Sequence, residues 1–400
     1  MDINLNEFID RHDTNSFKWE FMNMMDQNVP EGTLPFWVAD MDFPCADPII
    51  KALHKRVDRQ IFGYSMRDTA EYFRAVCGWY QHRYDWYLNS SDLFYCAGVV
   101  PALGYLIDVL TEPGEGVIIQ SPVYYPFKWN IENHNRSVIN NPLINKSGYY
   151  EIDFEDLERK AKEFNTTLAI LCSPHNPVGR IWKEEELIRF GRICKENNVF
   201  IVSDEIHGDL VRRGLKHIPL EKAFPEYRNK IITATAPSKT FNLAGMPMSN
   251  IIIHDKEIQE KWKKYCYDFL NIDLYNPLTI KAVQAAYAES EDWLEQVIDY
   301  LDNNMAYIEQ FLKENLSKAR YQRPEATYLV WIDVRDYGYS SEQISERMLN
   351  EAKVFIEEGT AFGEEGAGYI RMNVACPFDL LKEGLNRMAR VLNEEVAYED

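Results

Sequence analysis

The stretch LAILCSPHNPVGR, residues 168–180, decides the fold, because a short apolar run passes directly into a polar turn. The same pattern of an apolar run followed by a polar turn recurs in VFIVSDEIHGDL at residues 199–210 and in IITATAPSKTFN at residues 231–242. Short apolar runs bounded by turns are typical of buried strands, and helix-like segments between them indicate crossover connections. We therefore expect an α/β fold with a mostly parallel central sheet flanked by helices.

The pattern extends outward from this stretch in both directions. Three more apolar runs have the character of strands: LFYCA (93–97), GVIIQ (116–120) and NIIIH (250–254). Apolar periodicity predicts helices at 46–60, 69–83 and 183–197, and a long one at 291–316 that ends the alternation. Beyond it, strand-like YLVWIDV and GYIRMNV alternate with helical segments near 341–352 and 378–394. We predict an N-terminal segment (1–45) that joins a small α+β domain (291–400), and a large α/β domain (46–290).

Composition excludes several classes of protein. The 400 residues carry 43 Lys plus Arg against 63 Asp plus Glu, a formal net charge of -20, which argues against nucleic acid or an anionic bilayer as a partner. With 46% hydrophobic residues the chain can bury a large core, so it is not disordered. No apolar run approaches the roughly 18 residues of a membrane span, so we expect no membrane association.

The cysteines and the start of the chain indicate the compartment. Seven cysteines are scattered without a Cys-x-x-Cys pair, which argues against a disulfide framework or a structural zinc site. The opening MDINLNEFID is acidic and lacks an apolar core, unlike a secretory signal or a transit peptide. We expect reduced thiols in a cytoplasmic protein.

Nearly every predicted strand ends in a turn that carries reactive side chains. Because ligands of open α/β sheets bind at the carboxyl ends of the strands, these turns are expected to converge on one site. Neither Gly-x-x-x-x-Gly-Lys nor Gly-x-Gly-x-x-Gly follows a strand, which removes the best support for nucleotide binding. Gly98-Val99-Val100-Pro101 could still open a helix whose free N–H groups hold a phosphate.

Three further side chains point to a specific cofactor. Asn176, Asp204 and Lys239 each lie just beyond a predicted strand. Pyridoxal phosphate needs a lysine for its Schiff base, an acidic partner for its pyridine nitrogen and a donor beside its phenolic oxygen. Tyr124, in SPVYYP, could stack on such a ring.

The motifs SPHNPVGR, SDEIHGDL and APSKTFNLAG, in this order and spacing, resemble the fold-type I pyridoxal phosphate enzymes of the class I and II aminotransferase superfamily. WVADMDF (37–43), GVVPAL, DEIH, SKTFNLAG and YIRMNVACP are similar to its carbon–sulfur β-lyase branch, which includes MalY-type cystathionine β-lyases and cystalysin-like cysteine desulfhydrases. The likeness runs over nearly the whole chain. It implies the fold-type I transferase fold with its smaller α+β domain.

The resemblance implies a role for each matching residue. Lys239 would form the Schiff base, Asp204 would pair with the pyridine nitrogen, and Asn176 would donate to the phenolic oxygen. The remaining cofactor contacts would come from the main chain of Val99 and Val100, from the side chain of Ser238, and from Tyr124.

The substrate and a second subunit would complete the site. Arg371 would take the substrate carboxylate, since a guanidinium makes two parallel hydrogen bonds to it. Tyr125 would contact the substrate, and Tyr124 or Tyr125 would protonate the leaving sulfur. Tyr64, in FGYSMRD, resembles the tyrosine that such enzymes lend to the phosphate of a partner, so a homodimer is expected.

The implied activity is α,β-elimination from L-cystathionine, L-cysteine or a related S-substituted cysteine, giving pyruvate, ammonia and a thiol. His207 and Pro247 stand where the superfamily often has tyrosine and arginine, and the lyase branch shares both departures, which favours a lyase over an aminotransferase. A regulatory protein that retains the fold and the cofactor stays open as well.

Other polar and glycine-rich stretches are not assigned to the cofactor site. A metal-dependent hydrolase built on Asp204, Glu205, His207 and Asp209 ranks last, because their spacing matches no familiar zinc pattern. Asp40 and Asp42 are interpreted as caps of the helix after Pro44. The stretch with Gly363, Gly366 and Gly368 is expected to form a flexible loop at the rim of the site.

Overall fold

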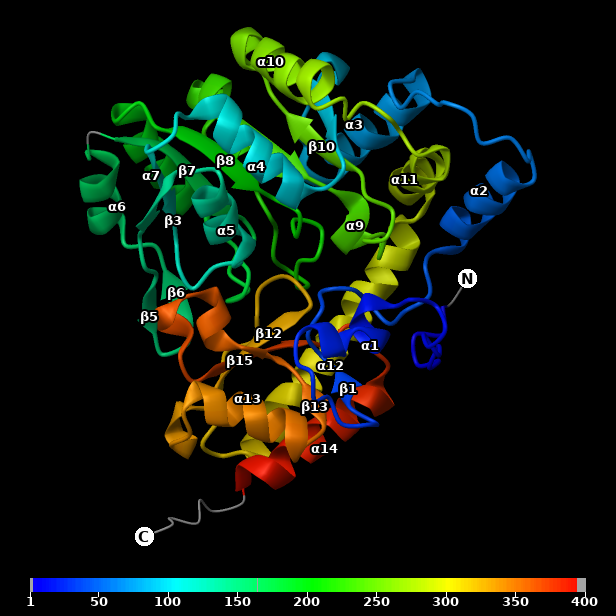
Figure 1. The fold of residues 1–400 in the computed structure, drawn as a ribbon, viewed down its shortest axis with the longest axis vertical. Coiled ribbons are helices and arrows are strands. Elements are labelled where there is room, and N and C mark those ends of the chain that lie inside the picture. The colour runs from blue at the N-terminus through cyan, green and yellow to red at the C-terminus, as the bar shows by residue number, and fades with distance from the viewer. Residues whose placement is uncertain (1–2, 164, 394–400) are drawn as a thin grey trace.

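Two larger β-sheets, one in each half of the molecule, organise the chain (Figure 1). The computed structural model describes residues 3–163 and 165–393. Within them the larger sheet has the order β2-β10-β9-β8-β7-β3-β4. Its strands are β2 (Leu93–Cys96), β3 (Gly116–Ile119), β4 (Ser137–Asn140), β7 (Thr166–Cys172), β8 (Phe200–Asp204), β9 (Ile231–Thr235) and β10 (Ser249–Ile252).

Strand direction decides where the polar turns meet. Strands β4, β3, β7, β8 and β9 pair in parallel, and β10 pairs antiparallel with both β9 and β2. Strand β2 therefore has the same direction as the parallel set, so all their carboxyl ends lie along one edge. The predicted α/β fold with a mostly parallel sheet is confirmed, and the run NIIIH supplies its one antiparallel strand within the described residues.

Helices cover both faces of this sheet because its strands are apolar on both sides. Along β7, Leu168 and Ile170 pack into one core cluster and Ala169 and Leu171 into another, as the alternation of a strand requires. The first cluster holds α4 (Val99–Leu110), α5 (Pro126–Asn133) and α10 (Lys256–Trp262). The second holds α6 (Phe154–Ala161), α7 (Glu184–Glu196) and α8 (Leu220–Ala223).

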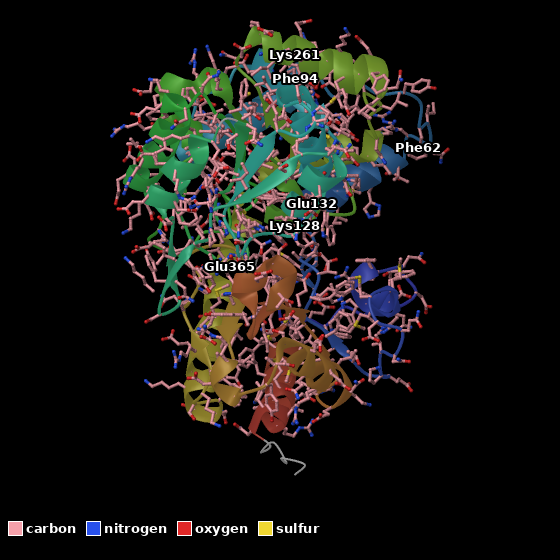
Figure 2. The ribbon with its side chains drawn as sticks, turned by 60° about the vertical axis from the view of Figure 1, so that its left-hand side comes forward. Phe62, Phe94, Lys128, Glu132, Lys261 and Glu365 are labelled. Carbon is pink, nitrogen blue, oxygen red and sulfur yellow. The ribbon has the colours of Figure 1, made fainter. Side chains whose placement is uncertain are left out.

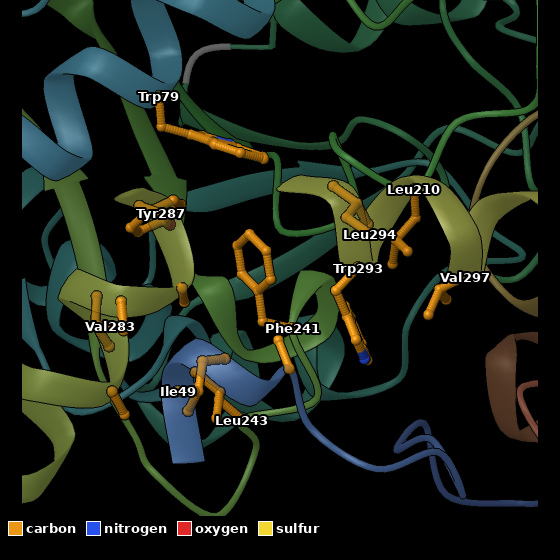
Figure 3. Packing of buried hydrophobic residues seen from close by; sticks show 14 of the residues in the cluster. Ile49, Trp79, Leu210, Phe241, Leu243, Val283, Tyr287, Trp293, Leu294 and Val297 are labelled. Carbon is orange, nitrogen blue, oxygen red and sulfur yellow. The ribbon is translucent and has the colours of Figure 1, made fainter. Parts of the chain in front are cut away.

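A third cluster joins the β2–β10 side of the sheet to the helices α2 (Asp47–Val57), α3 (Ala70–Tyr84), α11 (Pro277–Glu289) and α12 (Glu291–Asn315). Figure 3 shows Trp79, Tyr287, Phe241 and Trp293 at its centre. The ring centroids of Trp79 and Phe241 lie 5.4 Å apart in an edge-to-face arrangement. Burial of such rings stabilises the fold by about 2 kcal/mol each. Phe241 also belongs to the turn that follows Lys239, so this core fixes that turn.

The smaller sheet has the antiparallel order β11-β12-β15-β14 and packs against the later part of α12. It contains β11 (Arg320–Tyr321), β12 (Leu329–Asp333), β14 (Glu357–Glu358) and β15 (Tyr369–Asn373), with α13 (Ser341–Asn350) and α14 (Phe378–Asn393) beside it. Strand β1 (Leu34–Pro35) of the N-terminal segment pairs in parallel with β13 (Val354–Phe355). The short elements α1 (Phe17–Glu20), β5 (Ile144–Lys146), β6 (Tyr149–Glu151) and α9 (Pro237–Thr240) complete the described regular structure outside the 3-10 and π turns.

The predicted helices match the observed ones within a few residues, and residue 394, the last position of the predicted helix 378–394, lies outside the described residues. The prediction that Asp40 or Asp42 caps the helix after Pro44 is wrong. Helix α2 begins after Ala46 without a side-chain cap, whereas both carboxylates pair with cations of the N-terminal segment. In the described part of the chain no helix is long and apolar enough to cross a membrane.

Candidate active site

Lys239 lies on the short helix α9, directly beyond the carboxyl end of β9. Its Nζ donates a 2.7 Å hydrogen bond to the carbonyl oxygen of Ala39. Burial of the amine among protein atoms and the nearby positive charge of Arg371 lower the pKa of Lys239 to about 8, against the opposing effect of the Asp40 and Asp204 carboxylates. An amine in this state is largely neutral just above pH 8 and can act as a nucleophile or as a base.

Asp204 is the last residue of β8 and is 4% exposed. Its Oδ1 accepts a 3.2 Å hydrogen bond from the backbone N–H of Ile206. Burial, together with the negative charge of Glu205, raises the pKa of Asp204 to about 7 against the opposing effects of the Ile206 hydrogen bond and Lys239. None of the described residues forms an ion pair with Asp204, and a buried carboxylate without such a partner is unfavourable. A protonated pyridine nitrogen would supply the missing positive charge.

Arg371, on a strand of the smaller sheet, contacts the same edge of the large sheet. It is buried in the middle of β15, and its Nη1 donates a 3.0 Å hydrogen bond to Oδ1 of Asn176, in the turn after β7. Its Nη2 donates to the carbonyl oxygen of Trp37 at 3.2 Å and forms an ion pair with Glu357, its register partner on β14. The sequence analysis predicted Arg371 and Asn176 but missed Glu357, because nothing in the sequence indicates which residue a short edge strand places opposite Arg371.

Three tyrosines line the space around these groups. Tyr124 and Tyr125 follow β3, with ring centroids 5.3 Å apart, and the hydroxyl of Tyr125 donates to Glu357 at 3.3 Å. Burial raises the pKa of Tyr124, so its hydroxyl stays protonated and available as a proton donor. Tyr328 donates a 2.8 Å hydrogen bond to the same Ala39 carbonyl that Lys239 uses, and sequence reasoning missed it.

The start of α4 offers unbonded donors at the same edge of the sheet. Gly98 precedes the helix at φ 131°, a backbone angle that favours glycine, and it supplies no side-chain cap. The first N–H groups of the helix, including those of Val99 and Val100, therefore have no intrahelical partner. Ser238, next to Lys239 on α9, is half-buried. These groups fit an anion such as a phosphate.

The side chains of the DEIH turn diverge to different partners. Glu205 contacts His217 at 2.9 Å and Ser203 at 2.8 Å, whereas Asp209 accepts from Trp79 and Thr240. Burial lowers the pKa of His207 to about 3, so its ring is neutral. Over residues 3–163 and 165–393, no group of three or more His, Cys, Asp or Glu side chains could hold a metal ion.

Tyr64 lies apart from this site. It belongs to the segment without regular structure between α2 and α3, and 98% of it is exposed. Ile61, Phe62 and Met66 beside it are also exposed. The structure therefore gathers Lys239, Asp204, Asn176, Arg371, Tyr124 and Tyr125 in one region and leaves Tyr64 at the surface.

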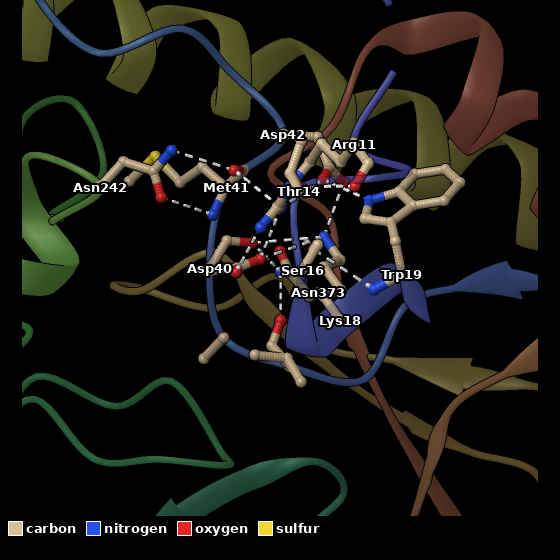
Figure 4. Close-up of polar contacts among 12 residues, drawn as sticks. Arg11, Thr14, Ser16, Lys18, Trp19, Asp40, Met41, Asp42, Asn242 and Asn373 are labelled. Carbon is tan, nitrogen blue, oxygen red and sulfur yellow. Dashed lines mark hydrogen bonds and ion pairs between the residues drawn. The ribbon is translucent and has the colours of Figure 1, made fainter. Parts of the chain in front are cut away.

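A charged cluster in the N-terminal segment fixes the backbone that Lys239 and Arg371 contact (Figure 4). Lys18 is fully buried and pairs with Asp42 at 2.6 Å, and Arg11 pairs with Asp40 and Asp42, each at 2.8 Å. Asn373 donates 2.6 Å hydrogen bonds to the carbonyl oxygens of Val38 and Asp40. Residues 37–42 are thereby held against β15, with the Trp37 and Ala39 carbonyls directed at Arg371 and Lys239.

In the stretch with Gly363, Gly366 and Gly368, Glu364–Gly366 form a 3-10 turn that follows another at Gly359–Phe362, and Gly363 lines a cavity with Trp37 and Tyr125. The flexibility of this stretch stays a prediction. A Cβ added to Gly366 would lie 2.0 Å from the carbonyl oxygen of Gly359, so the two backbones pack in direct contact.

Comparison with known proteins places this geometry in a family. The model for aminotransferase class I and II matches residues 34–388. The chain is 40% identical to cystathionine beta-lyase PatB of Bacillus subtilis (strain 168), over 98% of this chain and 100% of that protein. It is 30% identical to protein MalY of Escherichia coli (strain K12), over 96% and 97%. The crystal structure of cystalysin from Treponema denticola, which contains pyridoxal 5'-phosphate, superposes with a TM-score of 0.94 at 37% identity, over 98% and 99%.

These similarities cover both sheets and every turn that contributes to the site. The match begins at the first residue of β1 and ends within α14, so it includes the segment around Ala39 as well as β15 with Arg371. The chain belongs to the class I and II aminotransferase family.

Proposed function

We propose that this protein is a pyridoxal phosphate-dependent carbon–sulfur β-lyase that acts on L-cystathionine, L-cysteine or a related S-substituted cysteine. The observation that carries the proposal is the pairing of half-buried Lys239 with buried Asp204, an amine with a lowered pKa near a carboxylate with a raised pKa. The relatives named cystathionine beta-lyase and the structural likeness to cystalysin support a lyase.

The residues present fit the cofactor. Lys239 would hold it covalently, and Asp204 would pair with its pyridine nitrogen. The N-terminus of α4 with Ser238 would bind its phosphate, with Asn176 and Tyr124 beside the ring. When bound, pyridoxal phosphate supplies an electron sink for the carbanion at the α carbon of an amino acid.

Arg371 binds the substrate carboxylate, and Asn176 orients the guanidinium through their 3.0 Å hydrogen bond. Lys239 removes the α proton, because its lowered pKa makes the free amine available near neutral pH. Tyr124 donates a proton to the departing sulfur. For L-cystathionine the Cβ–S bond breaks, the thiol product is homocysteine, and water converts the remaining fragment to pyruvate and ammonia.

The test measures pyruvate release from L-cystathionine by the pyridoxal phosphate-loaded protein, without an added keto acid. Pyruvate from the parent and none from Lys239→Ala is the expected result. Consumption of the amino acid only when a keto acid is present would assign an aminotransferase instead. Full cofactor loading without turnover of any sulfur amino acid would favour the regulatory alternative.

We further propose a homodimer in which Tyr64 reaches the phosphate site of the partner subunit. The support is its 98% exposure among exposed apolar neighbours, which a partner surface would cover. All seven cysteines are free thiols, which supports a cytoplasmic location.

A further inference from the structure

A cavity of about 920 Å³ opens beside Arg371, between the large sheet and the smaller one. Trp37, Tyr125 and Glu357 line it, and each of them contacts Arg371 or a partner of Arg371. The cavity therefore adjoins the place where the substrate carboxylate binds. Its volume lies near the upper end of the range for small-molecule sites, far more than the thiol of cysteine fills.

The wall of this cavity is acidic. Five carboxylates line it besides Glu357: Asp26, Glu132, Glu358, Glu364 and Glu365. Among the described lining residues the single cation is Lys128, which lies 3.9 Å from Glu132 on the next turn of α5. Figure 2 shows Lys128, Glu132 and Glu365 at the level where the two halves of the molecule meet. A predominantly acidic wall attracts a positive charge and repels a negative one.

Among these carboxylates, Glu365 is held by an amide side chain of the large sheet. Its Oε1 accepts a 3.1 Å hydrogen bond from Asn140, and Asn140 in turn accepts a 2.7 Å hydrogen bond from Ser121, in the turn that also carries Tyr124. Its Oε2 is shielded from solvent and has no hydrogen-bond partner among the described residues. A buried carboxylate oxygen without a partner costs stability unless a donor reaches it, and an ammonium group is such a donor.

We propose that this cavity receives the leaving-group end of the substrate and selects S-substituted cysteines whose thiol part carries a distal amine. The inference rests on the proposed lyase function, because Arg371 must hold the carboxylate at the other end. A distal ammonium is attracted by the carboxylates of the wall, among which Glu365 has an unpaired oxygen that a small turn of its side chain would present to the ligand. A distal carboxylate is repelled, and a neutral alkyl group gains neither contact.

The first test measures binding without β-elimination. L-Lysine, L-norleucine and L-α-aminoadipate have side chains of similar length that end in a cation, a methyl group and an anion, and they lack a leaving group at the β carbon. Calorimetric titration of the pyridoxal phosphate-loaded protein is expected to give L-lysine a roughly tenfold lower Kd than L-norleucine, with L-α-aminoadipate weakest. The difference should shrink as salt is added. Equal affinities, or tighter binding of the anion, would overturn the proposal.

Two double variants locate the effect. Glu364→Gln with Glu365→Gln is expected to reduce the preference for L-lysine over L-norleucine severalfold. Glu342→Gln with Glu346→Gln removes the same charge from exposed positions of α13 that do not line the cavity, and should leave the preference unchanged. If both double variants lose the preference for L-lysine equally, the preference comes from the net charge of the protein and the role of the cavity is overturned.

Pyruvate release separates this inference from the lyase function. S-Aminoethyl-L-cysteine should have a higher kcat/KM than S-propyl-L-cysteine, and S-carboxymethyl-L-cysteine the lowest. Equal kcat/KM values for all three would refute the selective cavity while supporting the lyase. No pyruvate from any of them, with the lysine preference intact, would refute the lyase and uphold the cation-binding cavity.

Discussion

Replacement of Asp204 by asparagine should stabilise the cofactor-free protein while it impairs the enzyme. Asparagine keeps the shape of the side chain and an oxygen that can accept from the Ile206 N–H. It removes a negative charge that the fold buries without a bonded cation. In the loaded protein the same change removes the partner of the pyridine nitrogen, so turnover should fall by at least about a hundredfold.

The magnitude follows from the pKa of Asp204. Burial raises it from 3.8 to about 7, and each pH unit corresponds to about 1.36 kcal/mol, so ionisation above pH 7 costs the folded state about 4 kcal/mol. Because the folded pKa lies above the ordinary value, the folded state favours the protonated carboxyl. The stability that this proton provides is complete below the ordinary pKa and is lost as the pH rises through about 7. The free energy of unfolding of Asp204→Asn, relative to that of the parent, should therefore increase by about 3 kcal/mol from about pH 5 to about pH 8.

Thermal unfolding of the cofactor-free parent and variant at these two pH values measures the effect. Asp209→Asn is the matched control, because Asp209 is also buried but accepts hydrogen bonds from Trp79 and Thr240. An amide cannot accept at both atoms, so this control should lose about 1–3 kcal/mol of stability. If Asp204→Asn lowers the stability of the cofactor-free protein near pH 8, the carboxylate has a compensating cation and the reasoning fails.

Three further predictions concern the same site. Arg371→Lys should raise KM about a hundredfold with cofactor binding unchanged, because an ammonium cannot make two parallel hydrogen bonds to a carboxylate; an unaltered KM would place the carboxylate elsewhere. The rate at which the cofactor-free protein captures pyridoxal phosphate covalently, followed by absorbance, should rise with pH and level off above about pH 8, since the neutral amine of Lys239 is the nucleophile. Mixed dimers of Tyr64→Phe and Lys239→Ala should be more active than either variant alone, because one site then has both residues; no gain on mixing would refute the shared site.

Much of the fold was predictable because its signals are local. Each buried strand is a short apolar run, and its two faces follow from alternation, as along β7. The direction of the strands then brings Asn176, Asp204 and Lys239 to one edge, a consequence of parallel pairing that the order of motifs already contains. The edge position of the site thus needed no knowledge of tertiary contacts.

The rest depends on contacts between residues far apart in sequence. Ala39 and Lys239 are 200 residues apart, and a backbone carbonyl carries no side-chain signal, so that hydrogen bond could not be predicted. Asp42 resembles a helix cap in sequence, yet its pairing with Lys18 and Arg11 prevails, because a buried lysine requires a carboxylate close by. Glu357 meets Arg371 through the register of two strands joined by 3-10 turns, which the sequence does not specify.

The ion pair between Glu357 and Arg371 bears on how the substrate binds. A substrate carboxylate approaches a guanidinium that already has the carboxylate of Glu357, the amide oxygen of Asn176 and the carbonyl oxygen of Trp37 as partners. Its Nε is buried without a hydrogen-bond partner among the described residues, so a donor is still available. Glu357 also accepts from Tyr125, so movement of Glu357 would displace a tyrosine at the cavity wall. Binding at the carboxylate end and the shape of the leaving-group cavity are therefore linked through one side chain, Glu357.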